Sequence, residues 1–132
     1  RKGCLEQYAS ATGLVRLAKR YFEKNTKNSI LTGKEITAKE VFDAAKAGDA
    51  AALEITEEFG AYLGQALVNL AATVDPAVFV IGGGVSKAGD ILLETVRKYF
   101  YDHAFYGNQK TKITLATLGN DAGIYGAAKQ VL

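Results

Sequence analysis

The stretch Asp75–Asp90, DPAVFVIGGGVSKAGD, decides the fold. Pro76 disfavours the helical conformation at the residue before it, so a helix that comes from upstream ends here. The run AVFVI (77–81) is short, apolar and rich in β-branched residues, which is typical of a strand buried on both faces, usually in a parallel sheet. Three glycines follow, and then a helix from about Ala88 to His103. The stretch therefore predicts a strand–turn–helix unit of an α/β protein.

Three helices are predicted before this unit. Apolar residues recur at helical spacing over Leu5–Lys24. Thr37 and Glu40 form a capping box for a short helix that Gly48 ends. A long helix follows, which has Asp49 as its N-cap and runs to about Val74.

A second strand, ITLATL (113–118), and a last helix, Ile124–Val131, follow the central unit. The predicted order is α-α-α-β-α-β-α in one domain. A parallel pair buried on both faces needs further strands beside it, so we expect strands from an upstream region or from another chain. The 132 residues include no methionine, which also favours a fragment or a processed chain.

Composition excludes several classes of protein. The net charge is +2 and no basic block stands out, so neither nucleic acid nor an anionic membrane is an expected partner. The apolar runs are too short to span a bilayer, and no signal peptide is visible. The single cysteine cannot form an internal disulfide, which favours a reducing compartment. We therefore expect a cytoplasmic protein.

Gly82, Gly83 and Gly84 are the first candidate site. Glycines between a buried strand and a helix let a ligand approach the backbone, and a helix start offers free N–H groups to phosphate. The alternative, a tight turn without a ligand, stays open. A dinucleotide fingerprint fails because Lys87 stands where its third glycine belongs, and the sequence contains no P-loop motif.

Gly119, Asp121 and Gly123 open the last predicted helix. Asp121 or its neighbour Asn120 is a candidate N-cap. The helix also has a face of small residues, which allows close packing against another backbone: Ala122, Gly123, Gly126 and Ala127. Contact with another lobe at a hinge is one form that this packing could take.

Other residues have plainer expected roles. Gly60 and Gly64 lie one turn apart in the long helix, which predicts close packing against another helix or a contact between protomers. His103 lies near a helix end, where a positive charge is favourable, and we do not expect it to be catalytic. A solvated face is expected for a set of acidic residues: Asp43, Asp49, Glu54, Glu57 and Glu58.

Cys4 and Glu6 form the last candidate pair. A lone cysteine is usually a small buried apolar residue. The alternative is one zinc ligand beside a polar contact to a substrate. Zinc takes about four ligands, and the chain offers one cysteine and one distant histidine. The chain by itself is therefore not expected to hold zinc.

Three stretches together resemble the ROK family of sugar kinases and sugar-responsive repressors, and most of all its bacterial glucokinases: GCLEQYASATG (3–13), VFVIGGGVSKAGD (78–90) and TLGNDAGIYGAA (117–128). The resemblance covers essentially the whole chain. It implies the actin-like, ribonuclease-H-like sugar kinase fold, with two lobes and a cleft. Residues 1–132 would be a single, partial C-terminal lobe, helix-rich with a small parallel sheet.

The resemblance also implies roles for the candidate residues. Cys4 would be the last of three zinc-binding cysteines in the family motif C-x-C-G-x-x-G-C-x-E, with an upstream histidine as the fourth ligand. Glu6 would hydrogen-bond sugar hydroxyls, and the nucleotide would lie against Gly82–Gly84. The segment from Gly119 to Ala127 would lie near the hinge.

The implied activity is that of an ATP-dependent glucokinase, which phosphorylates the 6-hydroxyl of glucose with magnesium. We also expect structural zinc in the full-length protein, and a homodimer. The catalytic aspartate and the phosphate-binding loop would lie upstream, so the chain alone is expected to be inactive. The alternative is the sugar-sensing lobe of a ROK repressor, although the glycines on the nucleotide side favour a kinase.

Overall fold

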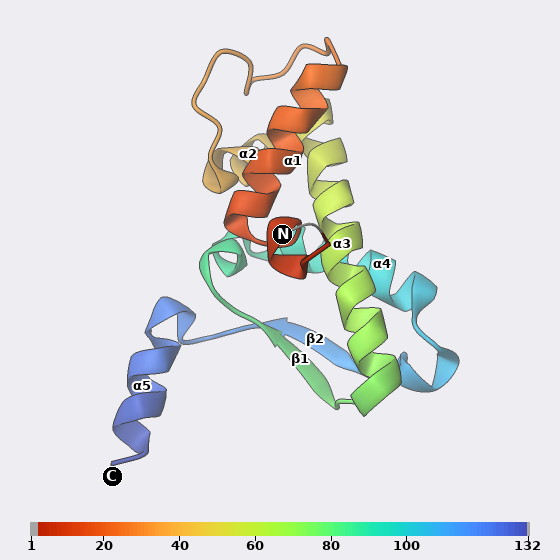
Figure 1. Cartoon of the computed structure of the whole chain (residues 1–132), viewed down its shortest axis with the longest axis vertical. Helices are drawn as coiled ribbons and strands as arrows, with labels where there is room; N and C mark the ends of the chain where they lie inside the picture. The colour runs from red at the N-terminus through yellow and green to blue at the C-terminus, as the bar shows by residue number, and fades with distance from the viewer. Residues whose placement is uncertain (1–2, 132) are drawn as a thin grey trace.

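Helices dominate the fold, and a small parallel sheet lies beneath them (Figure 1). The computed structural model describes residues 3–131, except for the side chain of Asn120. Within this range the α-helices are α1 (Ala11–Lys24), α2 (Ala38–Lys46), α3 (Ala50–Val74), α4 (Asp90–His103) and α5 (Ala122–Lys129). The strands are β1 (Val78–Ile81) and β2 (Lys112–Leu115). Single 3-10 turns are η1 (Leu5–Gln7), η2 (Gly84–Ala88), η3 (Tyr106–Asn108) and η4 (Gly119–Asp121). The predicted order of helices and strands is confirmed.

The first predicted helix is wrong over its first six residues. After η1 the backbone is extended at Ser10, whose hydroxyl accepts a hydrogen bond from the N–H of Gly13 at 3.0 Å and so caps α1. A Cβ at Gly13 would lie 2.7 Å from the backbone of Tyr8. Gly13 is therefore the residue that lets the chain fold back between η1 and α1.

Local capping explains where α2 and α3 begin. The Thr37 hydroxyl accepts from the Glu40 N–H at 3.3 Å, and the Glu40 carboxylate accepts from the Thr37 N–H at 2.9 Å. Asp49 accepts from the Ala52 N–H at 2.9 Å and caps α3. Both caps were predicted from the sequence, because a capping residue and its partner are only three positions apart.

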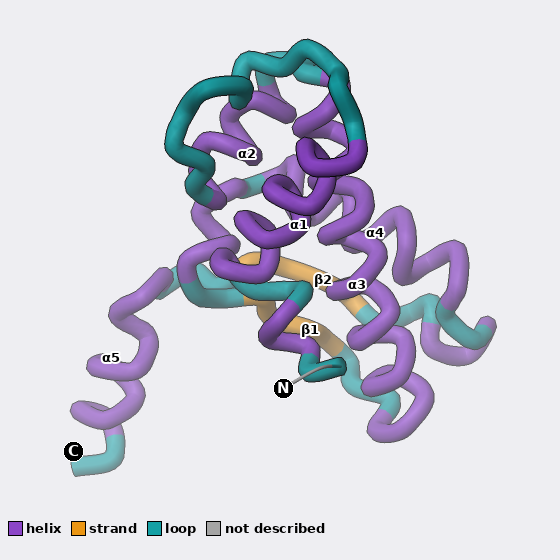
Figure 2. The backbone as a smooth tube through the Cα atoms, turned by 45° about the horizontal axis from the view of Figure 1, so that its top comes forward, coloured by secondary structure: helices purple, strands orange, loops and turns teal. Residues whose placement is uncertain are grey.

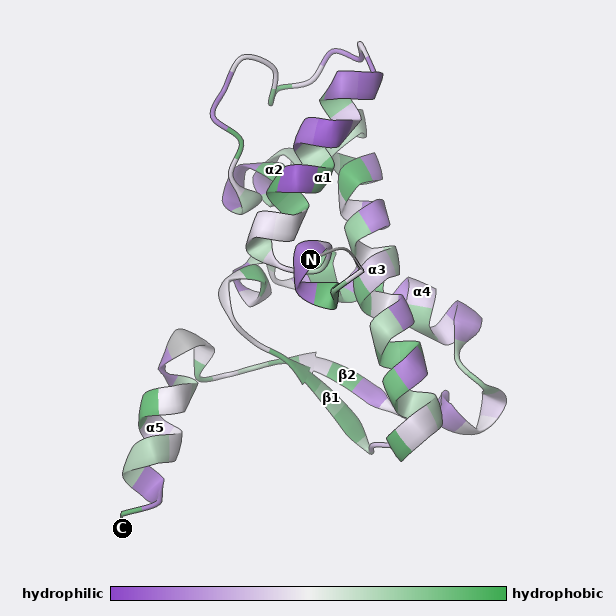
Figure 3. Ribbon diagram, viewed as in Figure 1, coloured by the Kyte–Doolittle hydropathy of each residue, from purple (hydrophilic) through white to green (hydrophobic). Residues whose placement is uncertain are grey.

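Helix α3 packs closely against α4. A Cβ built on Gly60 would lie 2.8 Å from the Thr95 side chain, and one built on Gly64 would lie 2.9 Å from Tyr99. The predicted close packing of this glycine pair against another helix is confirmed. Apolar residues of the helices form the buried core around this contact. Figure 3 shows apolar and polar residues alternating along these helices.

The two strands pair in parallel, with Phe79 opposite Ile113. Phe79 and Ile113 face the helices, and the ring of Phe79 meets that of Phe100 on α4 edge to face at 6.0 Å. Val78 and Val80 point to the other side, where 45% and 60% of their surfaces are exposed. The prediction of a strand buried on both faces is wrong for the described residues, because α1–α4 cover only one side of the strands (Figure 2).

The two edges of the sheet differ. Lys112 donates to Ala77, just before β1, and Ala116 donates to Ile81, so the backbone groups of Ile113 point away from β1. The Arg97 guanidinium on α4 donates to the Ile113 carbonyl at 2.5 and 3.2 Å and so binds one carbonyl of this outer edge of β2. No strand of the described range pairs with the outer edge of β1.

The boundaries of three further elements differ from the predictions. α4 begins at Asp90 because Gly89, with a φ of 74°, separates it from η2. β2 is Lys112–Leu115 rather than 113–118, and α5 is Ala122–Lys129 rather than Ile124–Val131. α5 projects from the rest of the chain (Figure 1). Within residues 3–131 no helix combines the length and apolar character needed to cross a membrane.

Candidate functional site

The glycine turn joins β1 to η2, as predicted. Gly83 has a φ of 79°, a conformation that L side chains rarely adopt. A Cβ built on Gly82 would lie 3.5 Å from that of Ala116, whereas one on Gly83 or Gly84 would have nothing within 4 Å. The Ser86 hydroxyl donates to the Gly83 carbonyl at 2.7 Å and holds the turn from within. The turn thus leaves its backbone open to a ligand at Gly83 and Gly84.

A hollow of about 180 Å³, partly open to solvent, lies between this turn and α2. Its apolar lining comes from Ala38 and Phe42 on α2 and from Val85 and Ala88 on η2, with Gly84 at its wall. A ligand that combines a flat apolar part with polar groups fits a hollow of this kind. We call it the α2–η2 pocket.

The charges around the α2–η2 pocket are mostly positive. Lys39, Lys46 and Lys87 line it together with one carboxylate, that of Asp43, which leaves two positive charges in excess. Lys39 donates to Asp43 at 2.6 Å, and this hydrogen bond lowers the pKa of Asp43 and raises that of Lys39. Lys46 also favours the charged form of Asp43. An anionic group of a ligand would be attracted to this rim.

Sequence reasoning missed the contribution of α2 to this pocket. The capping box located α2, but nothing in the local sequence indicates that Phe42 and Lys46 face a turn some forty residues downstream. This contact depends on how α2 packs against α3 and η2.

Glu6 and Cys4 lie apart from the pocket lining, at η1. Both residues are exposed, and the Cys4 thiol is free. The backbone carbonyl of Glu6 accepts a hydrogen bond from the Ser10 hydroxyl at 2.7 Å, which leaves the Glu6 carboxylate uninvolved. η1 rests on α1 and α3, and the ring of Tyr8, just beyond it, packs at a tilt against that of Tyr62 on α3, with 4.9 Å between the ring centroids. The Glu6 carboxylate is therefore accessible on a supported turn.

The donor groups of the described residues do not fit a metal site. Between residues 3 and 131 no three side chains of His, Cys, Asp or Glu come together in a way that could hold an ion. Cys4 offers one thiolate where zinc takes about four ligands. Within residues 3–131, Cys4 is therefore one donor of the zinc site that the family resemblance implies, and the other donors are not brought beside it.

The three hinge candidates gather where β2 leads into α5. Gly119 has a φ of 56°, and η4, which contains it, packs on η2 next to the glycine turn. Asp121 stands at the N-cap position of α5, but its side chain makes no capping hydrogen bond. The side chain of Asn120, the other predicted cap, lies outside the described residues. A Cβ on Gly123 would meet nothing within 4 Å. The small-residue face of α5 thus has no packing partner in the described part of the chain.

The remaining candidates have structural contacts. The His103 ring lies in the last turn of α4, with Nδ1 2.8 Å from the Tyr99 carbonyl. Four of the five acidic residues are about half exposed, as predicted, but each forms an ion pair with a basic partner: Asp43–Lys39, Glu54–Lys27, Glu57–Lys98 and Glu58–Arg20. Asp49 differs from them, because it binds the loop before α2 as well as capping α3.

Known proteins match the whole chain. The ROK family matches residues 1–132. A glucokinase of Halalkalibacterium halodurans is 43% identical over 129 residues, which are 94% of this chain and 39% of that protein. A crystal structure of a ROK family glucokinase from Streptomyces griseus, in complex with glucose and AMPPNP, superposes with a TM-score of 0.87 at 35% identity and covers 98% of this chain and 45% of its own.

A ROK family transcriptional regulator, a homologue of the E. coli MLC protein, has the same fold with a TM-score of 0.71 at 26% identity, over 87% of this chain and 29% of its own. This chain thus spans less than half the length of each of these three proteins. The structural neighbours include ROK sugar kinases, which have an actin-like fold, so the predicted fold class is confirmed. The match over all 132 residues shows that this chain belongs to the ROK family.

Proposed function

We propose that this chain is the C-terminal lobe of a longer ATP-dependent sugar kinase, which transfers the γ-phosphoryl group of ATP to the 6-hydroxyl of glucose. The observation that carries the proposal is the α2–η2 pocket beside the open glycine turn. Similarity to a glucokinase, and to a glucokinase structure that contains glucose and AMPPNP, supports it.

The nucleotide would use the pocket and the turn in different ways. The apolar wall at Phe42 and Val85 suits a purine base, while Lys46 and Lys87 supply positive charge for phosphate groups. Gly83 and Gly84 present backbone without a side chain, so the ligand can approach closely. This chain would thereby bind and orient the phosphoryl donor.

Glu6 would orient the sugar. An ionised carboxylate accepts hydrogen bonds from hydroxyl groups, and these charge-assisted bonds fix a sugar ring more firmly than neutral ones. Closure of the two lobes would then exclude water from the reacting groups. Magnesium, the structural zinc that Cys4 would help to bind, the homodimer and the cytoplasmic location remain parts of the same proposal.

A ROK repressor is the second candidate function, and similarity to the transcriptional regulator supports it. In a repressor Glu6 would still bind sugar, but the α2–η2 pocket would have no role in turnover. Purified whole protein distinguishes the two, because only the kinase forms ADP in a glucose-dependent reaction.

Gly84→Ala tests the nucleotide side of the proposal. Gly84 does not have a positive φ and faces open space, so alanine is tolerated in the free protein and its methyl group meets only a bound ligand. In the whole protein we expect the KM for ATP to rise about tenfold, the loss of one good contact, with little change in the KM for glucose.

Glu23→Ala is the control, because it changes an exposed side chain of α1 that does not line the pocket. It should leave both KM values unchanged. An unchanged KM for ATP in Gly84→Ala would remove the glycine turn from the nucleotide site.

Glu6→Ala tests the sugar side. Loss of the carboxylate removes hydrogen bonds to sugar hydroxyls, so the KM for glucose should rise about tenfold or more and kcat/KM should fall. Glu23→Ala, which removes another exposed carboxylate from α1, is the control and should change neither. A wild-type kcat/KM in Glu6→Ala would exclude Glu6 from the sugar site.

A further inference from the structure

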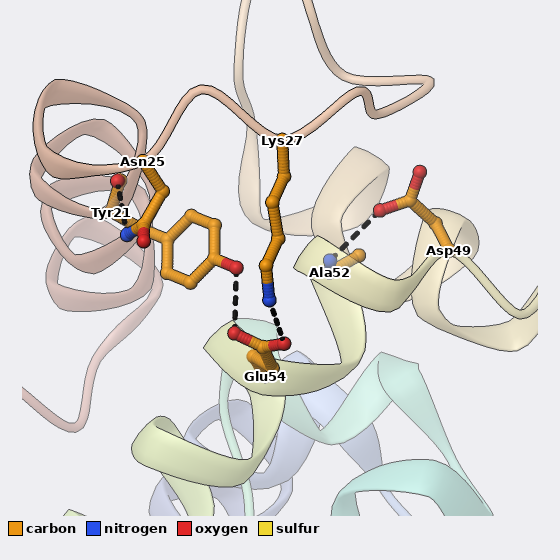
Figure 4. A network of polar contacts seen from close by, with 6 residues as sticks. All are labelled: Tyr21, Asn25, Lys27, Asp49, Ala52 and Glu54. Carbon is orange, nitrogen blue, oxygen red and sulfur yellow. Dashed lines mark hydrogen bonds and ion pairs between the residues drawn. The ribbon is translucent and has the colours of Figure 1, made fainter.

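The loop between α1 and α2, residues 25–36, is tied to the first turns of α3 by two carboxylates, those of Glu54 and Asp49. Figure 4 shows the contact of Lys27 with Glu54 and the bond of Asp49 to the Ala52 N–H. Near its start, the Tyr21 hydroxyl donates to Glu54 at 2.6 Å and Lys27 pairs with the same carboxylate. Farther on, Asp49 accepts from the Ser29 hydroxyl at 3.0 Å and from the Ile30 N–H at 2.8 Å. Asp49 thus binds the part of the loop that lies nearer to α2.

The three hydrogen bonds of Asp49 serve two roles, since one caps α3 and two bind the loop. Its Oδ1 accepts from the Ser29 hydroxyl and from the Ala52 N–H, the latter being the cap of α3. Its Oδ2 accepts from the Ile30 N–H. A residue needed only as a cap would require a single oxygen, so the second oxygen serves the loop.

This carboxylate joins the two ends of α2. The loop it binds leads into α2 at Ala38, and Asp49 itself stands three residues after α2 ends at Lys46. A helix of nine residues is marginal on its own, so its position depends on what surrounds it. Asp49 thus holds both ends of the segment that contains α2 against the start of α3.

α2 separates the loop from the α2–η2 pocket. On its loop side, Ile30 and Leu31 line a second hollow against Asp43 and Ala44. Asp43 lines both hollows, and Leu31 is buried with only 2% of its surface exposed. A loop released from Asp49 would therefore let α2 shift relative to Gly84 on the opposite side.

We infer that Asp49 is a positioning residue for the nucleotide pocket. By holding the loop against the start of α3, it fixes α2, and α2 carries one wall of the α2–η2 pocket. The inference rests on the proposed function, because it assigns a second role to a side chain that does not itself line the pocket.

Two substitutions at this position separate capping from positioning. Serine is as good an N-cap as aspartate, but it lacks the second oxygen that accepts from the Ile30 N–H of the loop. Asp49→Ser should therefore keep the cap of α3 and release the loop, whereas Asp49→Ala should lose both. Both variants are made in the whole protein, and ATP binding is measured by calorimetry alongside KM and kcat.

We expect both variants to raise the Kd and the KM for ATP by about five- to twentyfold, with kcat and the KM for glucose within about twofold of wild type. Asp49→Ala should lower the Tm by about 2–4 °C more than Asp49→Ser does, which is the amount of a lost cap. Wild-type ATP affinity in Asp49→Ser would overturn the inference while leaving the proposed function intact. A wild-type protein without ATP binding or glucose-dependent turnover would overturn both.

Discussion

At the scale of single residues, Asp49 also makes stability depend on pH. Partial burial alone would raise its pKa, but the hydrogen bonds from the N–H groups of Ala52 and Ile30 and from the Ser29 hydroxyl outweigh burial and lower the pKa below its ordinary 3.8. A carboxyl with a lowered folded pKa stabilises the fold above its unfolded pKa of about 4. That stabilisation is lost as pH falls through the folded pKa.

The difference in free energy of unfolding between wild type and Asp49→Ser should accordingly be constant above about pH 5 and narrow as the pH falls below about 4. Urea titrations of the whole protein over this pH range measure it. A difference that stays the same at every pH would show that the charge on Asp49 does not contribute.

Single residues also show which hydrogen bonds can be predicted from the local sequence. Thr37 and Asp49 were predicted as caps because each binds a backbone group three residues away. The bonds from Asp49 to Ser29 and Ile30 span about twenty residues, and no local pattern predicts them. Ser10 was missed because apolar residues keep helical spacing on both sides of it.

At the scale of elements, the crossing of α3 and α4 depends on glycine. In Gly60→Ala the new methyl group would lie 2.8 Å from the Thr95 side chain and 3.1 Å from its backbone, so the helices must separate. We expect a loss of about 1–3 kcal/mol in the free energy of unfolding, measured by urea denaturation of the whole protein.

Glu23→Ala in α1 is the helical control. Its side chain is exposed, so its removal should change the free energy of unfolding by no more than about 0.5 kcal/mol. Equal effects of the two substitutions would contradict the assignment of Gly60 to a packed crossing.

The sequence predicted features that lie within one helix or strand, but not features that depend on contacts between distant ones. The order of helices and strands, the glycine turn and the parallel pairing follow from patterns within each segment. Burial on both faces of β1 was wrong, because Val78 and Val80 need a second layer that residues 3–131 do not provide. The α2–η2 pocket depends on two distant elements meeting, which periodicity does not predict.

At the scale of the whole molecule, the described chain leaves apolar surface uncovered. Besides the two valines of β1, Ile124 and Tyr125 on α5 are 71% and 59% exposed. Apolar side chains gathered on an unpaired sheet and a projecting helix are typical of surfaces that pack against further structure. This agrees with the proposal that the chain is one lobe of a longer protein.

The 132-residue chain alone should therefore form no ADP in a glucose-dependent reaction, since the proposal places the catalytic base and the phosphate-binding loop elsewhere. A coupled assay that compares the chain, its Glu6→Ala variant and the whole protein measures this. Turnover by the chain above that of the Glu6→Ala variant would contradict the expectation.

The unequal edges of the sheet have a consequence for reassembly from separate pieces. A complementary fragment would add a strand beside Val78 and Val80, where the edge of β1 has no described partner, whereas Arg97 competes for the edge of β2 at the Ile113 carbonyl. A slip of one residue in the added strand would turn its apolar side chains away from these two valines. Such a split protein would rejoin on one side and in one register, as a reporter of two-fragment association requires.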